Sequence, residues 1–218
     1  MRSKWVLVGL AVMAAVMAAC GGAPREEKKA EVPKPKAPPP AEYRVRFETT
    51  RGPFTIEVKR EWAPKGADHF YGLASDGFYD GVRFHRVIRG FVAQFGINGN
   101  PKLNALWSAT YIPDESPLPP RRLRNRKGTI TFAVRGPNTR ATQVFVNLRD
   151  NLDLDRSGFV PFGRVTEGLD VVEKLYYSYG ELPPRGQGPD PAQSELLGEE
   201  YFARSFARLD RIEKAVVE

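Results

Sequence analysis

Short runs in which apolar and charged side chains alternate begin at residue 43 and recur along the rest of the chain. Residues 43–47 (YRVRF) alternate in this way, and residues 54–59 (FTIEVK) do so again after Gly52 and Pro53. Because successive side chains of a strand point to opposite faces, these two runs predict a β-hairpin. Further strands are predicted by similar runs at residues 82–88, 91–96, 128–134, 142–148, 160–165 and 209–217.

Apolar positions follow a helical spacing in two segments, residues 64–75 and 169–179. We expect one helix in each, the first beginning at Pro64, because proline suits the first turn of a helix. About eight strands with two helices, and no alternation between them, favour an antiparallel barrel or sandwich over a parallel sheet. The other long segments, residues 97–127 and 180–206, are predicted to be loops.

The N-terminus has a different pattern. Residues 1–4 carry two positive charges, and residues 5–19 are uncharged and mostly apolar, which is the layout of a secretory signal peptide. Fifteen helical residues reach roughly 22 Å, short of the ~30 Å hydrocarbon core, which disfavours a permanent transmembrane helix. Residues 17–21 (MAACG) resemble the lipobox of bacterial lipoproteins. This resemblance implies that Cys20 is lipidated by diacylglycerol; an incidental cysteine behind a plain signal peptide is the alternative.

A proline-rich segment follows, at residues 21–41, with six prolines, eight charges and no aromatic side chain. Such a composition buries too little apolar surface to offset the entropy of ordering, so we expect a disordered tether. The predicted organisation is a signal peptide at 1–19, a lipidated cysteine and linker at 20–42, and one folded domain at 43–218. We therefore expect the domain in the cell envelope, outside the cytoplasm, anchored to a membrane by lipid, and in the periplasm if the cell is Gram-negative.

Composition and charge exclude several kinds of site. One cysteine and two histidines cannot assemble a Cys/His zinc site. Asp153 begins a run that imitates a calcium-binding loop, but Arg164 stands at the twelfth position, where glutamate is required. Lys and Arg exceed Asp and Glu by 33 to 26, and five of these cations lie in residues 121–127. Without interleaved aromatic residues, this run predicts a solvated basic loop. We expect no metal, no cofactor and no nucleic-acid partner.

Three ordered blocks resemble one known family. Residues 84–96 (FHRVIRGFVAQFG) strongly resemble the signature strand pair of the cyclophilin peptidyl-prolyl cis-trans isomerases. Residues 128–147 resemble the central strand, turn and next strand of that family, and residues 158–172 its following strand and second helix. The resemblance covers about residues 43–218. It implies a mainly β fold, a closed eight-stranded antiparallel barrel capped by two α-helices, and isomerisation of X-Pro bonds.

Isomerisation requires rotation about an amide bond whose barrier is about 20 kcal/mol, and it needs neither a nucleophile nor a metal. The useful groups are an apolar pocket for the proline ring, hydrogen bonds to the peptide backbone, and a cation beside the prolyl nitrogen. The cation stabilises the lone pair that localises on nitrogen as the amide twists.

By the resemblance, Arg86 supplies this guanidinium, and Gln94 orients it and binds substrate backbone. The expected substrate-binding residues are Phe91, Val92 and Phe145 around the proline ring, Phe159 or Leu154 closing the pocket, and Ala133, Val134 and Gln143 along the peptide. His85 precedes the arginine on the same strand and should face the other side, so we interpret it as structural.

The sequence therefore predicts a peptidyl-prolyl isomerase that acts on exported proteins and assists their folding in the cell envelope. Its partners are expected to be proline-containing polypeptides and a membrane, and we expect a monomer. A non-catalytic cyclophilin-like module that binds proline-containing segments is the alternative. Val92 stands where methionine is common in the family, which keeps the pocket apolar and should affect substrate preference. Val134 stands where asparagine is common, so its backbone can still bind the peptide but a side-chain amide is lost.

Overall fold

The computed structural model describes residues 38–115 and 123–218, and the findings below concern these residues. Residues 1–37 lie outside the described residues, and they hold the predicted signal peptide, Cys20 and most of the predicted linker. The first two arginines of the basic run, Arg121 and Arg122, also lie outside the described residues. Among the described residues, no helix is both long enough and apolar enough to cross a membrane.

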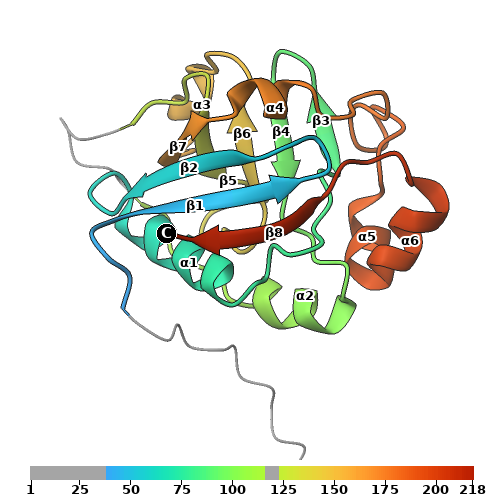
Figure 1. Ribbon diagram of the computed structural model, residues 1–218, viewed down its shortest axis with the longest axis horizontal. Helices are drawn as coiled ribbons and strands as arrows, with labels where there is room; N and C mark the ends of the chain where they lie inside the picture. Colours follow the sequence, from blue (N-terminus) through green and yellow to red (C-terminus); the bar gives the residue numbers. More distant parts are fainter. Residues whose placement is uncertain (1–37, 116–122) are drawn as a thin grey trace, which may run out of the picture. The chain divides into compact units, whose positions relative to one another are not determined.

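Eight strands form one sheet in which every neighbouring pair is antiparallel (Figure 1). They are β1 (Glu42–Thr49), β2 (Phe54–Lys59), β3 (Arg86–Ile88), β4 (Val92–Phe95), β5 (Thr129–Phe132), β6 (Val144–Asn147), β7 (Pro161–Glu167) and β8 (Ile212–Val217). Their order across the sheet is β3-β4-β6-β5-β7-β2-β1-β8. The predicted hairpin is confirmed as β1 and β2, with Val45 opposite Ile56.

The expected closed barrel is wrong, because β3 and β8 are the two edges of the curled sheet and do not pair as strands. The edges approach each other at residues 81–84, which precede β3. There, an isolated bridge joins Arg83 to Arg211, and the Ile212 backbone N–H donates to the Val82 carbonyl at 2.8 Å. Residues 82–85 are all buried, so they lack the one-sided alternation that was expected of a strand over 82–88.

Six helices lie among the described residues, four more than the sequence predicted. They are α1 (Pro64–Ser75), α2 (Pro101–Ser108), α3 (Asp153–Arg156), α4 (Leu169–Glu173), α5 (Pro191–Leu197) and α6 (Glu199–Ser205). The helix predicted at 64–75 is confirmed, whereas the one predicted at 169–179 ends at Glu173.

The prediction that residues 97–127 and 180–206 are loops was wrong. The first segment contains α2, and the second contains α5 and α6. Two of these helices begin with a side-chain cap followed by proline. Asn100 accepts hydrogen bonds from the backbone N–H groups of Lys102 and Leu103, and Asp190 accepts one from that of Gln193. Such caps satisfy donors that have no partner inside the helix, which allows short helices to form in segments with weak apolar periodicity.

The core lies between the concave face of the sheet and α1, which packs against β8, β7 and β2 (Figure 1). Aromatic side chains fill it: Phe47 stacks on Phe54 with ring centres 4.9 Å apart, and Phe70 lies 4.9 Å from Phe162. A second, smaller apolar cluster holds the segment after α4 in place. It consists of Ile97, Tyr201, Phe202, Phe206 and Leu209.

Candidate active site

The two predicted catalytic residues lie opposite each other on neighbouring strands. Arg86 of β3 pairs with Gln94 of β4, and its Nη1 donates a hydrogen bond to Gln94 Oε1 at 3.1 Å. The Gln94 side chain is buried and its Nε2 donates in turn to Gln143 Oε1 at 2.9 Å. The structure therefore joins these three predicted residues in one hydrogen-bonded row.

An apolar cavity of about 240 Å³ opens beside this row. It is smaller than the ~300–1,000 Å³ of sites for drug-sized ligands, and its size suits a single side chain. The rings of Phe145 and Phe159 meet edge to face with centres 5.7 Å apart. The lining residues are Arg86, Phe91, Val92, Gln94, Ala133, Val134, Phe145, Leu154 and Phe159. These are all of the predicted catalytic and substrate-binding residues except Gln143.

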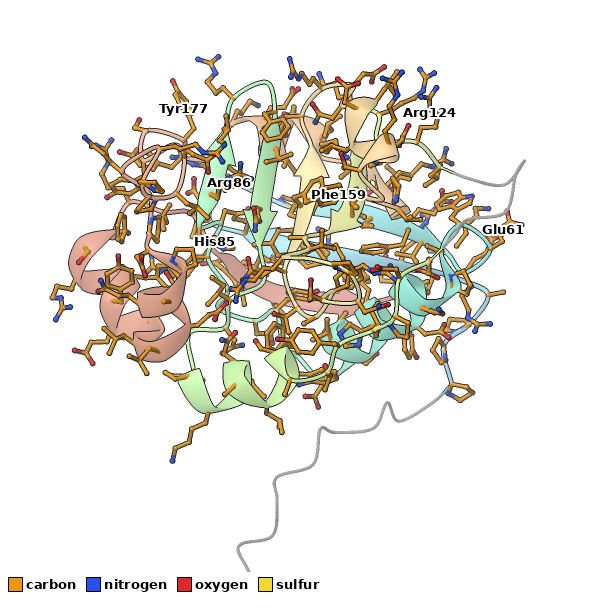
Figure 2. All side chains as sticks on the ribbon, turned by 180° about the vertical axis from the view of Figure 1, so that it is seen from behind. Glu61, His85, Arg86, Arg124, Phe159 and Tyr177 are labelled. Atoms are coloured by element: carbon orange, nitrogen blue, oxygen red, sulfur yellow. The ribbon has the colours of Figure 1, made fainter. Side chains whose placement is uncertain are left out.

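Arg86 and Phe159 both line this cavity, and both are labelled in Figure 2. The guanidinium carbon of Arg86 is 5.6 Å from the centre of the Phe91 ring, within the range of a cation–π contact. The cavity thus places a permanent positive charge beside an apolar pocket lined by aromatic rings. This is the combination that twisting of a prolyl amide requires.

Sequence reasoning missed Glu181, which contacts the candidate catalytic arginine. Its carboxylate accepts two hydrogen bonds from Arg86, from Nε to Oε1 at 2.5 Å and from Nη2 to Oε2 at 2.7 Å. These hydrogen bonds hold the pKa of the Glu181 carboxyl below its ordinary range, and the Leu182 backbone N–H acts in the same direction. Glu181 lies in the segment that was predicted to be a loop, 95 residues from Arg86, and no motif around it pointed to this contact.

A second cavity, of about 270 Å³, adjoins the first and shares Gln94, Ala133 and Val134 with it. Gln143 lies here, and its Nε2 donates to Glu195 Oε1 at 3.2 Å. Arg135 also pairs with Glu195, which belongs to α5. The predicted peptide-contacting residues thus extend across two adjoining hollows.

Both histidines lie outside the cavity that holds Arg86. The His85 side chain is buried. Burial, and to a lesser degree the charge of Arg86, lowers the pKa of His85 to about 3. A side chain that stays neutral and lines neither cavity fits the structural interpretation (Figure 2).

Two other features of the sequence are the run from Asp153 that imitates a calcium-binding loop and the basic run at residues 121–127. Asp153 begins α3, whose Leu154 faces the apolar cavity, and the described residues contain no group of three or more His, Cys, Asp or Glu placed to hold a metal. In the described part of the basic run, Arg124 pairs with Asp155 at 2.8 Å. Lys127 likewise pairs with Glu173, at 2.6 Å.

The site combines a small apolar cavity with a guanidinium held by three hydrogen bonds, on a curled antiparallel sheet. The family model described as cyclophilin type peptidyl-prolyl cis-trans isomerase/CLD matches residues 44–184. The chain belongs to this family. A solved cyclophilin-type isomerase of Cryptosporidium parvum has the same fold, with a TM-score of 0.57 at 22% identity, covering 81% of this chain and 98% of that one.

Several curated relatives carry isomerase names. Peptidyl-prolyl cis-trans isomerase CYP18-2 of Arabidopsis thaliana is 32% identical over 65% of this chain and 84% of its own length. The isomerase ppi1 of Schizosaccharomyces pombe is 35% identical over 60% of this chain and 83% of its own. The match to peptidyl-prolyl cis-trans isomerase-like 2 of Gibberella zeae, 36% identical over 60% of this chain, spans 22% of that much longer protein.

Proposed function

We propose that this chain isomerises X-Pro bonds of exported proteins and assists their folding in the cell envelope. The observation that carries the catalytic part is the position of Arg86 on the apolar cavity that Phe91 and Phe145 line. The cavity holds the proline ring, and the guanidinium donates to the prolyl nitrogen. The names of the relatives support the same activity.

The reaction needs stabilisation that acts in the twisted state and not in the planar one. A planar amide nitrogen gives its lone pair to the carbonyl and is a poor acceptor. As the bond twists, the lone pair localises on nitrogen, and an N–H donor beside it then gains a hydrogen bond. Because this bond exists only in the transition state, it accelerates rotation without tightening the binding of substrate.

The cellular part of the proposal rests on the N-terminal sequence. Residues 1–19 have the layout of a signal peptide, and Cys20 follows them directly. Lipidation at Cys20, with the proline-rich segment as a tether, anchors the domain to a membrane outside the cytoplasm. Unfolded chains entering that compartment contain X-Pro bonds that equilibrate in tens to hundreds of seconds, so a local isomerase shortens their folding.

A second candidate function is a module that binds proline-containing segments without turning them over. The ion pair between Arg86 and Glu181 favours it, because the carboxylate offsets the charge of the guanidinium. In this function the apolar cavity still accepts a proline ring, but the twisted amide is not stabilised.

Exchange spectroscopy on a short X-Pro peptide separates these functions. With the full chain in detergent, we expect isomerisation well above the spontaneous rate, and a loss of roughly 100-fold in Arg86→Ala. Arg46→Ala is the matched control, because Arg46 is a half-buried strand arginine that pairs with Glu48 and does not line the cavity. Peptide binding without a rate above the spontaneous one would establish the binding module instead.

Lipidation is tested separately by mass spectrometry of the chain isolated from membranes. We expect an acylated N-terminal Cys20 and no signal peptide, and release of Cys20→Ser from the membrane fraction. Unmodified Cys20 in the mature chain would contradict the anchor and leave the isomerase activity untouched.

A further inference from the structure

We infer that Glu181 is a positioning residue for Arg86: its carboxylate holds the guanidinium in the orientation that the twisted amide requires. The inference rests on the proposed isomerase function. It brings the segment between α4 and α5 into the catalytic apparatus, which the motifs on β3 and β4 do not indicate.

The hydrogen bonds that Arg86 makes to Glu181 and Gln94 leave two of its N–H groups available to a substrate. A guanidinium has five N–H groups in a rigid plane. Glu181 takes one from Nε and one from Nη2, and Gln94 takes one from Nη1. One N–H therefore remains on each of Nη1 and Nη2, while three hydrogen bonds to two residues fix the plane of the group. The ion pair restrains the guanidinium along one edge and does not block it.

The backbone around Glu181 is built to hold the carboxylate in place. The Leu182 backbone N–H donates to Glu181 Oε1 at 2.8 Å, and the Gly188 N–H donates to the Glu181 carbonyl at 2.9 Å. A Cβ at position 186 would lie only 2.2 Å from that carbonyl, so the close turn requires glycine at Gly186. The Leu182 N–H thus restrains the Glu181 carboxylate directly, and the Gly188 N–H restrains the Glu181 backbone.

Partial burial makes the restraint effective. The Arg86 side chain is 17% exposed and that of Glu181 is 27% exposed, so water competes with their hydrogen bonds less than at an open surface. A long arginine side chain without such partners samples several rotamers, and ordering it during the reaction is unfavourable. A carboxylate that orders the arginine side chain beforehand removes this entropy cost from the activation barrier.

A second arginine–glutamate pair, Arg83 with Glu199, supplies a matched control. Arg83, three residues before Arg86, forms an equivalent pair with Glu199, from Nε to Oε2 at 3.0 Å and from Nη2 to Oε1 at 2.5 Å. Neither residue lines either of the two adjoining cavities of the candidate active site. Glu199→Gln thus removes a bidentate ion pair between the same two parts of the chain without touching the candidate active site.

The test compares Glu181→Gln, Glu181→Ala and Glu199→Gln in the full chain, in the peptide exchange assay. We expect kcat to fall roughly tenfold in both Glu181 variants with KM changed less than twofold, and no effect in Glu199→Gln. In an Arg86→Ala background, Glu181→Gln should cause no further loss, since it acts only through the guanidinium. An unchanged kcat, a rise in kcat, or a full additional loss in that background would each overturn the inference.

An NMR measurement separates this inference from the proposed function. In the wild-type chain, the Arg86 Nε–H should relax as a rigid group, and in Glu181→Gln it should become mobile while the melting temperature stays within about 3 °C. Rigid Arg86 in a chain without isomerase activity would refute the proposed function. Equal mobility in the two proteins would refute the role of Glu181, whatever the activity.

Discussion

Arg86 and Gln94 face each other across β3 and β4, and the hydrogen bond between their side chains is 3.1 Å long. The register of one tight hairpin sets this contact: Ile88, two positions after Arg86, pairs with Val92, two positions before Gln94. The candidate catalytic guanidinium is thus positioned by the sheet itself on one side, and by Glu181 on the other.

Replacement of Gln94 should lower catalysis more than it lowers stability. Gln94→Leu removes the acceptor for Arg86 and the donor to Gln143, so the guanidinium loses one of its three restraints. We expect kcat/KM to fall about tenfold. The exposed Gln193 of α5 provides a control, and Gln193→Leu should leave kcat/KM unchanged. Equal rates in wild type and Gln94→Leu would show that this hydrogen bond has no catalytic role.

Truncation of Phe145 should weaken peptide binding. Phe145→Ala removes a wall of the apolar cavity and the edge-to-face contact with Phe159. We expect a rise in KM of roughly tenfold or more, together with a loss of about 3 kcal/mol in the free energy of unfolding. In the second apolar cluster, Phe206→Ala should cost similar stability with KM unaltered, because Phe206 lines neither cavity. Peptide titrations and chemical denaturation measure the two effects.

Gly96, at the end of β4, should tolerate no side chain. Its φ is +113°, and a Cβ there would lie 2.3 Å from the Thr142 carbonyl oxygen. We expect Gly96→Ala to reduce the free energy of unfolding by more than about 3 kcal/mol. Gly81 has φ of +76° but open space around it, so Gly81→Ala should cost only about 1–2 kcal/mol. Similar unfolding midpoints for the two variants would contradict the steric argument.

Stability should fall as the pH decreases below about 6.5. Burial lowers the pKa of His69 to about 4 and that of His85 to about 3. The unfolded chain therefore binds protons on its two histidines below pH ~6.5, whereas in the folded chain both histidines stay neutral until the pH is much lower. Because the unfolded state binds more protons, acid favours unfolding. We expect a slope approaching about 1.4 kcal/mol per pH unit for each histidine between pH 4.5 and 5.5.

Urea unfolding measured over this pH range tests the prediction. His69→Gln and His85→Gln should each remove about half of the slope, although His69→Gln also disturbs the hydrogen bond of His69 Nε2 with the Ala141 carbonyl. A wild-type stability that is flat from pH 6.5 to 4.5 would mean that both histidines titrate normally in the fold.

Strands and motifs were predictable from the sequence because they depend on local spacing. Alternation over 43–47 and 54–59 gave the first hairpin, and the block at residues 84–96 placed Arg86 and Gln94 on adjacent strands. The residues assigned to the pocket by resemblance do line one cavity. Periodicity and a matched motif are thus sufficient to assemble the half of the site that the sheet carries.

The rest of the site depends on contacts that no local pattern encodes. Glu181 reaches Arg86 from 95 residues away, and its segment has neither strand alternation nor a full helical period. Helices α5 and α6 are seven residues each, too short for a clear apolar periodicity, and the cluster around Phe202 and Phe206 holds the surrounding segment. The prediction of a closed barrel was wrong for a similar reason. Residues 81–85 lie between the two sheet edges, β3 and β8, and their packing is not encoded in a local pattern.

The pairing of β1 with β8 has a consequence for the order of events during synthesis. Val45 pairs with Val217, and Phe47 pairs with Ala215, so an early strand of the domain waits for one made more than 160 residues later. Until then β1 has one neighbour and presents an open edge, the kind of surface that joins other strands. A holding chaperone that covers this edge during translation would be of use to a protein whose own proposed task is to help others fold.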